Sequence, residues 1–175
     1  VGTNEPWAVN TWDDKQTAIG GYGDLPDGAG GKGLFLQNAD NNVAAQLFLG
    51  QPIPLPAGRM YELSFSYRLA GDGKGDYKVE GTGITAGGSD LLPTGTAWKT
   101  VTRKIPVGMS AASLGILFHN FIGGAAGTLW IKDFKIADIG GYTPHRAAPL
   151  VPVTVDGAKV TVFPAVAGVE TSPDY

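Results

Sequence analysis

The side chains that most often carry out catalysis are scarce in this protein of 175 residues. It has two histidines, His119 and His145, and no cysteine, so cysteine nucleophiles, thiolate metal sites and disulfides are excluded. The sequence has no G-x-S-x-G or H-E-x-x-H motif, and the glycine-rich segment 20–33 lacks the G-K-[ST] of a phosphate-binding loop. The adjacent acids Asp13 and Asp14 are more typical of solvated surface than of catalytic carboxylates. The sequence therefore predicts no catalytic site in this protein.

Composition narrows the function classes further. Hydrophobic residues make up 43% of the sequence, enough to build a core, whereas charged residues are only 17%. The net charge of −3 gives no basic patch for nucleic acid or for an anionic membrane surface. No apolar run approaches the roughly 20 residues that cross a bilayer. We therefore expect neither nucleic acid nor membrane as a partner.

A sugar-binding site requires types of residue that this sequence contains. A pyranose presents an apolar face and a rim of hydroxyls, so its site combines aromatic rings with amides, carboxylates or guanidinium groups. The alternative is that Arg68, Lys78 and Glu80 form a solvated face, and that His119 is a half-buried structural residue. A register shift of one residue would bring in Tyr77 and Asn120 instead. The predicted ligand-binding residues on outward-facing strand positions are Phe35, Gln37, Gln46, Arg68, Glu80, His119 and Phe121.

The elements that must position these residues are short strands. Helical periodicity is nearly absent, and runs rich in Val, Ile, Phe, Tyr and Thr are bounded by Gly, Pro, Asn and Asp. This pattern predicts an all-β fold, an antiparallel β-sandwich or jelly roll. Alternation puts Tyr61, Leu63, Phe65, Tyr67 and Leu69 on one face, and Leu114, Ile116 and Phe118 on another. The strongest runs are 33–37, 43–49, 60–69, 76–84, 98–105, 112–121 and 128–137.

Three segments, in order, resemble motifs of β-sandwich carbohydrate-binding modules of families 4, 9, 16 and 22. PLPAGRMYELSFSYRLAG (54–71) resembles their L-x-P-G-x-x-Y-x-L-S-F signature, TAWKTVTRKIPV (96–107) a later strand, and TLWIKDFKI (128–136) the closing strand. The resemblance covers about residues 1–139. It implies a non-catalytic module that targets an attached glycoside hydrolase or polysaccharide lyase to its polysaccharide. The alternative is a structural or adhesion sandwich that packs against a catalytic domain or another protein and binds no glycan.

The resemblance also has consequences for particular residues. Where the family carries an aromatic residue in the S-F-W-x-R strand, this sequence has Ser66, so the binding platform could shift to Trp7, Trp12 and Tyr22 in the N-terminal loops. Related modules often hold a structural calcium, which needs six to eight oxygen ligands. Here Asp133 matches an acid of the closing motif, and Glu5 and Asp40 are its predicted partners. We expect Trp98 and Trp130 to pack in the core, and the alternative is that they stack on a sugar.

The two ends of the sequence differ from its middle. The first thirty residues are glycine-rich and are expected to be irregular, anchored by Trp7 and Trp12. Residues 140–175 read as a linker and the opening strands of a following domain, with a hairpin at Asp156-Gly157. This organisation predicts that a catalytic domain or catalytic subunit is the partner on the C-terminal side of the segment. Together with the resemblance, it predicts a secreted or cell-surface protein.

Overall fold

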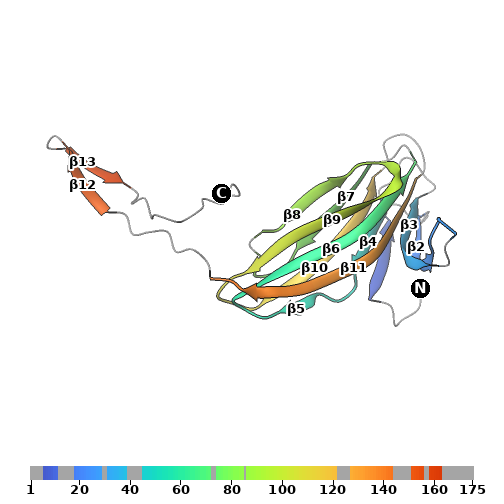
Figure 1. Ribbon diagram of the computed structural model, residues 1–175, viewed down its shortest axis with the longest axis horizontal. Helices are drawn as coiled ribbons and strands as arrows, with labels where there is room; N and C mark the ends of the chain where they lie inside the picture. Colours follow the sequence, from blue (N-terminus) through green and yellow to red (C-terminus); the bar gives the residue numbers. More distant parts are fainter. Residues whose placement is uncertain are drawn as a thin grey trace. The chain divides into compact units, whose positions relative to one another are not determined.

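The computed structural model describes residues 6–11, 18–28, 31–38, 45–71, 74–84, 86–121, 127–143, 151–155 and 158–162. Within these ranges every regular element is a strand, and no helix is present that could span a membrane. The predicted all-β fold is confirmed (Figure 1). The strands are β1 (Trp7–Thr11), β2 (Ala18–Asp24), β3 (Lys32–Asn38), β4 (Ala45–Leu49), β5 (Ile53–Leu55), β6 (Arg59–Ala70), β7 (Lys74–Glu80), β8 (Gly88–Leu92), β9 (Gly95–Val107), β10 (Ala112–Phe121), β11 (Gly127–Gly141), β12 (Val151–Val155) and β13 (Ala158–Val162).

Two antiparallel sheets form the sandwich. Sheet A has the order β1-β4-β10-β7-β8, and β5 pairs with β10 beside this path. Sheet B has the order β2-β3-β11-β6-β9. Figure 1 shows β9, β6 and β11 of sheet B side by side across the front of the sandwich. Because consecutive strands often belong to different sheets, residues far apart in the sequence become neighbours on one face.

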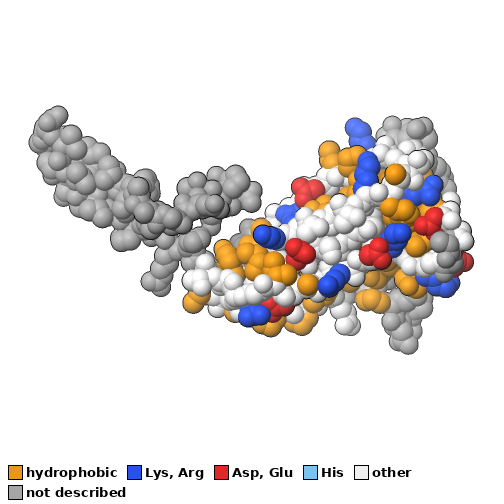
Figure 2. All heavy atoms as spheres, in the orientation of Figure 1, with side chains coloured by type: hydrophobic (Ala, Val, Ile, Leu, Met, Phe, Trp, Pro, Cys, Tyr) orange, Lys and Arg blue, Asp and Glu red, His pale blue; other side chains and the backbone are white. Residues whose placement is uncertain are grey.

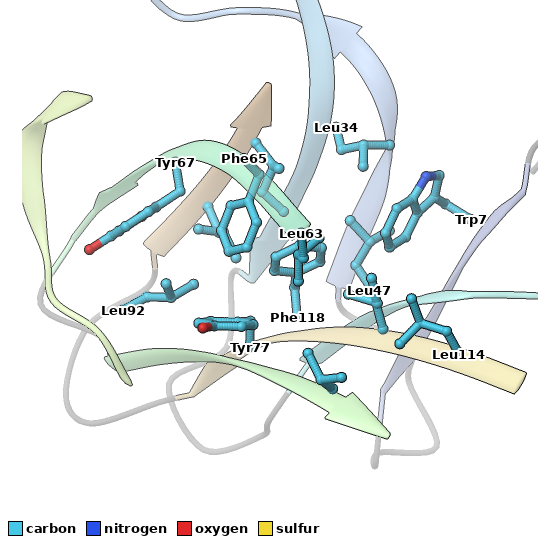
Figure 3. Packing of buried hydrophobic residues seen from close by; sticks show 14 of the residues in the cluster. Trp7, Leu34, Leu47, Leu63, Phe65, Tyr67, Tyr77, Leu92, Leu114 and Phe118 are labelled. Atoms are coloured by element: carbon cyan, nitrogen blue, oxygen red, sulfur yellow. The ribbon is translucent and has the colours of Figure 1, made fainter. Parts of the chain in front are cut away.

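The core lies between the sheets and follows the predicted alternation. The five residues expected on the inner face of β6, from Tyr61 to Leu69, are all buried. The Phe65 ring makes edge contacts with Phe118 at 5.0 Å and with Tyr77 at 5.1 Å between centroids (Figure 3). Tyr77 and Asn120 point inward, with 3% and 2% exposure, so the predicted register is right and the shifted one is wrong.

The prediction of an irregular N-terminus is wrong, because β1 and β2 are strands of the two sheets. The sequence of β2, AIGGYGD, does not indicate a strand, because glycine is depleted in strands. A Cβ at Gly20 would lie 2.6 Å from Val9 Cγ2 and 2.8 Å from the Phe35 carbonyl oxygen. Close approach of neighbouring backbone explains that glycine. Trp7 is 8% exposed and is confirmed as an anchor, whereas Trp12 lies outside the described residues.

The protein divides into two compact units, Val1–Thr143 and Pro144–Tyr175. In the second unit β12 and β13 pair antiparallel, with Val155 opposite Ala158. This pairing confirms the hairpin that Asp156-Gly157 predicts, because two residues separate the paired strands.

Candidate functional site

The structure divides the predicted ligand-binding residues between the outer faces of two different sheets. Phe35, Gln37 and Arg68 lie on β3 and β6 of sheet B, whereas Gln46, Glu80 and His119 lie on β4, β7 and β10 of sheet A. Phe121 ends β10, and its side chain lies outside the described part of the protein. Alternation predicts that a residue points outward, but it carries no information on which sheet its strand joins. The predicted single surface is therefore two surfaces.

On sheet A the outward side chains form a polar row across three adjacent strands. His119 on β10 is opposite Gln46 on β4 and opposite Asp76 on β7. The Nδ1 atom of His119 lies 2.5 Å from Oδ1 of Asp76. Although both side chains face away from the core, only 13% and 12% of their surfaces are exposed. A carboxylate at Nδ1 fixes the orientation of the imidazole ring.

An apolar and charged row lies beside the polar one. Leu117 on β10 is opposite Phe48 on β4 and Lys78 on β7. All three side chains are half-buried, and the Lys78 ammonium lies 2.7 Å from Oε2 of Glu80. The two rows together place an aromatic ring and an aliphatic side chain next to an amide, an imidazole and carboxylates. This is the combination of groups that sugar binding requires.

On sheet B the outward residues pair rings with cations. Trp130 on β11 is opposite Phe35 on β3 and Arg68 on β6, and the Arg68 guanidinium carbon lies 5.5 Å from the Trp130 ring centroid. The Lys132 ammonium lies 4.2 Å from the centroid of Trp98. Figure 2 shows this side of the molecule, where Lys and Arg side chains lie beside hydrophobic ones. Each indole therefore has a cation from its own sheet over it.

The prediction that Trp98 and Trp130 pack in the core is wrong, because both are half-buried on the outer face of sheet B. Leu129 and Ile131 take the inward positions of β11, so Trp130 between them points outward. The Trp98 Nε1 donates a hydrogen bond to Asp27 Oδ2 at 3.1 Å. Strict alternation in TLWIKDFKI would have identified Trp130, whereas the role of Lys132 depends on sheet order.

Two residues of the alternative platform, Trp7 and Tyr22, line one cavity of about 620 Å³. Trp7 belongs mostly to the core and packs edge-on against Phe134 at 5.3 Å, whereas Tyr22 is 57% exposed. We name this the Tyr22 cavity. Its lining consists of Pro6, Trp7, Tyr22, Lys32, Gly33, Leu34, Ile131, Lys132, Asp133 and Phe134.

Asp133, the predicted calcium ligand, also lines the Tyr22 cavity. Its φ of 55° makes it the one non-glycine residue at positive φ among the described residues, and it lies where the register of β11 against β6 shifts. Glu5 and Asp40 lie outside the described residues. Within the described part of the protein, no three His, Asp or Glu side chains gather to hold a metal. One carboxylate cannot supply six to eight oxygens, so the calcium site stays a prediction.

A hydrogen-bonded cluster joins the two sheets at the β8 edge. The Tyr77 hydroxyl donates to Asp90 Oδ2 at 2.8 Å, and the same oxygen accepts from Arg103 Nη1 at 3.0 Å. Arg103 on β9 also donates to the carbonyl oxygens of Gly88 and Ala86. Burial, reinforced by the hydrogen bond to Asp90, raises the pKa of the Tyr77 phenol to about 12. Sequence reasoning missed this cluster because its members come from three separate strands.

Comparison with known proteins finds similarity in structure. No protein-family model matches the sequence, and no curated protein matches it either. Among solved structures the protein is similar to the enzymatically active domain of bacteriophage CBA120 tailspike protein 4, with a TM-score of 0.57 and 15% identity over 77% of this chain. The matched part is 19% of that domain. The protein is also similar to TmCBM61, solved in complex with β-1,4-galactotriose, with a TM-score of 0.54 and 21% identity over 76% of this chain and 88% of that one.

A third similar structure is a CBM4 module, with a TM-score of 0.53 and 14% identity over 76% of this chain and 94% of that one. The protein thus has the β-sandwich fold of carbohydrate-binding modules, and the resemblance indicated by its sequence motifs is confirmed at the level of fold.

Proposed function

We propose that this protein is a glycan-binding module whose ligand lies across the outer face of sheet A. The observation that carries the proposal is the row of Gln46, His119 and Asp76, which lie in register on three adjacent strands. A glycan that crosses these strands would meet hydrogen-bonding groups about every 4.8 Å, the spacing between neighbouring strands. The adjoining Phe48 and Leu117 would contact the apolar faces of its rings.

Each polar residue of the row has a distinct part in this proposal. The Gln46 amide both donates and accepts hydrogen bonds, so it can donate to a sugar hydroxyl or accept from one. Asp76 holds the His119 ring in place through Nδ1, which makes Asp76 a positioning residue for His119. The Lys78 and Glu80 pair borders the row and adds a donor and an acceptor.

We also propose that the module serves a larger, secreted polysaccharide-degrading protein. Two similar structures support this, since the matched part is 19% of the tailspike domain and 24% of an exo-β-agarase, which has a TM-score of 0.53 and 14% identity. Both are described as enzymes or enzymatically active, so this fold occurs as one portion of such proteins. An attached hydrolase or lyase would then be held near its substrate by the module.

Affinity electrophoresis tests the binding proposal. Native gels containing xylan, mixed-linkage β-glucan, β-1,4-galactan or agarose compare wild type with Gln46→Ala and His119→Ala. We expect at least one polysaccharide to retard wild type and both variants to be retarded less. Thr102→Ala, on an exposed outward position of β9 in sheet B, is the matched control and should migrate like wild type. Failure of every polysaccharide to retard wild type would favour a structural or adhesion sandwich.

A further inference from the structure

The Tyr22 cavity has features of a ligand site that the sheet A row does not use. Its volume of about 620 Å³ lies within the 300–1,000 Å³ that small-molecule sites usually have. Its described lining comes from β1, β2, β3 and β11 and from Pro6, which precedes β1, and it shares no residue with the Gln46, His119 and Asp76 row. The two surfaces can therefore be altered independently.

One part of the cavity wall is apolar and is fixed by the core. Leu34 and Ile131 are 7% and 0% exposed, and Trp7 is held edge-on by Phe134. Tyr22, in contrast, keeps 57% of its surface exposed while lining the same space. An exposed aromatic ring beside a hollow can stack on a flat apolar surface of a ligand.

The backbone shapes the cavity at two positions. A Cβ at Gly33 would lie 2.5 Å from the Ile131 carbonyl oxygen and 2.8 Å from Leu25 Cδ2, so this glycine lets the backbones of β3 and β11 approach closely beside the cavity. Asp133 adopts a φ of 55° within a register shift of β11. Bulges re-aim side chains, and such conformations in non-glycine residues gather at ligand sites because the strain must be compensated.

The lining of the cavity contains both positive and negative side chains. Each lysine ammonium group in it already has a partner in the protein. Lys32 lies 3.0 Å from Asp24 Oδ1, and Lys132 lies over the Trp98 ring. Asp133 adds an exposed carboxylate to the same lining. A strongly anionic ligand would meet this carboxylate, and a cationic ligand would meet two lysines. A neutral ligand with many hydroxyls can instead donate to the carboxylate and accept from an ammonium.

We propose that the Tyr22 cavity is a second carbohydrate site, which takes a neutral pyranose with its apolar face on Tyr22 and its hydroxyls toward Asp133. The inference extends the proposed glycan-binding function and rests on it for the class of ligand, but it uses other residues. Asp133 then contacts the sugar directly, so this proposal gives its carboxylate a different role from that of the predicted calcium ligand.

Nuclear magnetic resonance titrations test the second site. Uniformly ¹⁵N-labelled protein in EDTA receives methyl β-D-glucopyranoside, methyl β-D-galactopyranoside, methyl β-D-xylopyranoside or sodium glucuronate. We expect saturable shifts of the Tyr22, Gly33 and Asp133 amide resonances with at least one neutral glycoside. Tyr22→Ala should weaken binding roughly 5–10-fold through lost stacking. Asp133→Asn should weaken it about 10-fold, because hydrogen bonds to a charged group contribute more than neutral ones.

Matched variants separate this inference from the proposal on sheet A. Ile19→Ala, on the same strand as Tyr22 and 61% exposed, should bind like wild type. His119→Ala should leave the shifts near Tyr22 unchanged even if polysaccharide retention falls. The inference is overturned if no neutral glycoside shifts these resonances, if glucuronate alone does, or if binding appears only after calcium is added. Unchanged affinity in both Tyr22→Ala and Asp133→Asn would also overturn it. None of these outcomes bears on the Gln46 and His119 variants in the polysaccharide gels.

Discussion

The outer faces of the two sheets contain similar kinds of side chain and arrange them in opposite ways. On sheet B, Arg68 lies over Trp130 and Lys132 lies over Trp98. Each of these indole rings is therefore in contact with a cation from the same sheet. On sheet A, Gln46, His119 and Asp76 line up across three strands, beside a half-buried Phe48. The difference shows that aromatic residues alone do not mark a glycan surface, since their faces can already be covered.

The energy needed to uncover the rings distinguishes the two faces. A sugar that stacks on Trp130 or Trp98 must first displace the cation, which costs about 0.5–2 kcal/mol for each pair. That cost is comparable to the roughly 0.5–1.5 kcal/mol that a pair of stacked aromatic rings contributes beyond the area it buries. A sugar on sheet B therefore has to compete with a cation for each of the two indole rings.

The largest expected effect on stability comes from the outer face of sheet B. Trp130→Ala removes a half-buried indole that contacts Arg68, and we expect it to lower the free energy of unfolding by about 2–3 kcal/mol. Urea unfolding measures this loss. If the two faces differ as described, the variant still binds polysaccharide below its unfolding transition. Lost retention in Trp130→Ala with an unchanged unfolding midpoint would instead place the glycan on sheet B.

The hydrogen-bonded cluster of Tyr77, Asp90 and Arg103 at the β8 edge gives a pH-dependent change in stability of similar size. The pKa of Tyr77 is raised to about 12 in the folded protein, against about 10 when unfolded. The folded state therefore favours the neutral phenol, and its stabilisation is complete below pH 10 and is lost between pH 10 and 12. Two pKa units correspond to roughly 2–3 kcal/mol.

Tyr77→Phe tests this pH dependence, because phenylalanine keeps the ring in the core and cannot ionise. Urea unfolding from about pH 9 to about pH 12 should show a steeper fall in stability for wild type than for the variant. The lysines titrate in both proteins and cancel in the difference. Parallel curves would mean that Tyr77 ionises as freely in the folded protein as in the unfolded one.

A smaller effect is expected at Arg68, which the sequence predicts as a ligand-binding residue. Its Nε is buried and has no hydrogen-bond partner among the described residues. Arg68→Met keeps the aliphatic stem over Trp130, removes the cation–ring attraction and also removes that unsatisfied group. The two effects oppose each other, so we expect the stability to change by less than about 1 kcal/mol. Thermal melting measures the change, and a loss above that value would show that the guanidinium has a further partner.

Much of the fold can be predicted from the sequence, because it follows from local pattern. The alternation in β6 identifies its inner face from Tyr61 to Leu69, and Asp156-Gly157 identifies a hairpin. Strand β2 cannot be predicted in the same way. The absence of a side chain at Gly20 lets Val9 and Phe35 approach the backbone of β2 closely. That contact is known only once the sheets are assembled.

The candidate site is harder to predict, since it depends on which strands become neighbours. Gln46, Asp76 and His119 each look like ordinary outward polar residues, and only the order β4-β10-β7 puts them in one row. Sheet order likewise separates Arg68 from His119, although the sequence predicts that both contact one ligand. The backbone conformation of Asp133 could not be predicted either, because its positive φ accompanies a register shift between β11 and β6 that depends on their pairing.

The most direct test of the central claim compares His119→Ala with Arg68→Met in one affinity gel. Both variants remove an outward polar side chain from the middle of a sheet, and their melting temperatures are measured first to show that both are folded. If the outer face of sheet A binds the glycan, His119→Ala loses most of its retardation by the polysaccharide that retards wild type, and Arg68→Met keeps it. Retardation that is lost in Arg68→Met and kept in His119→Ala would contradict the account and place the glycan on sheet B.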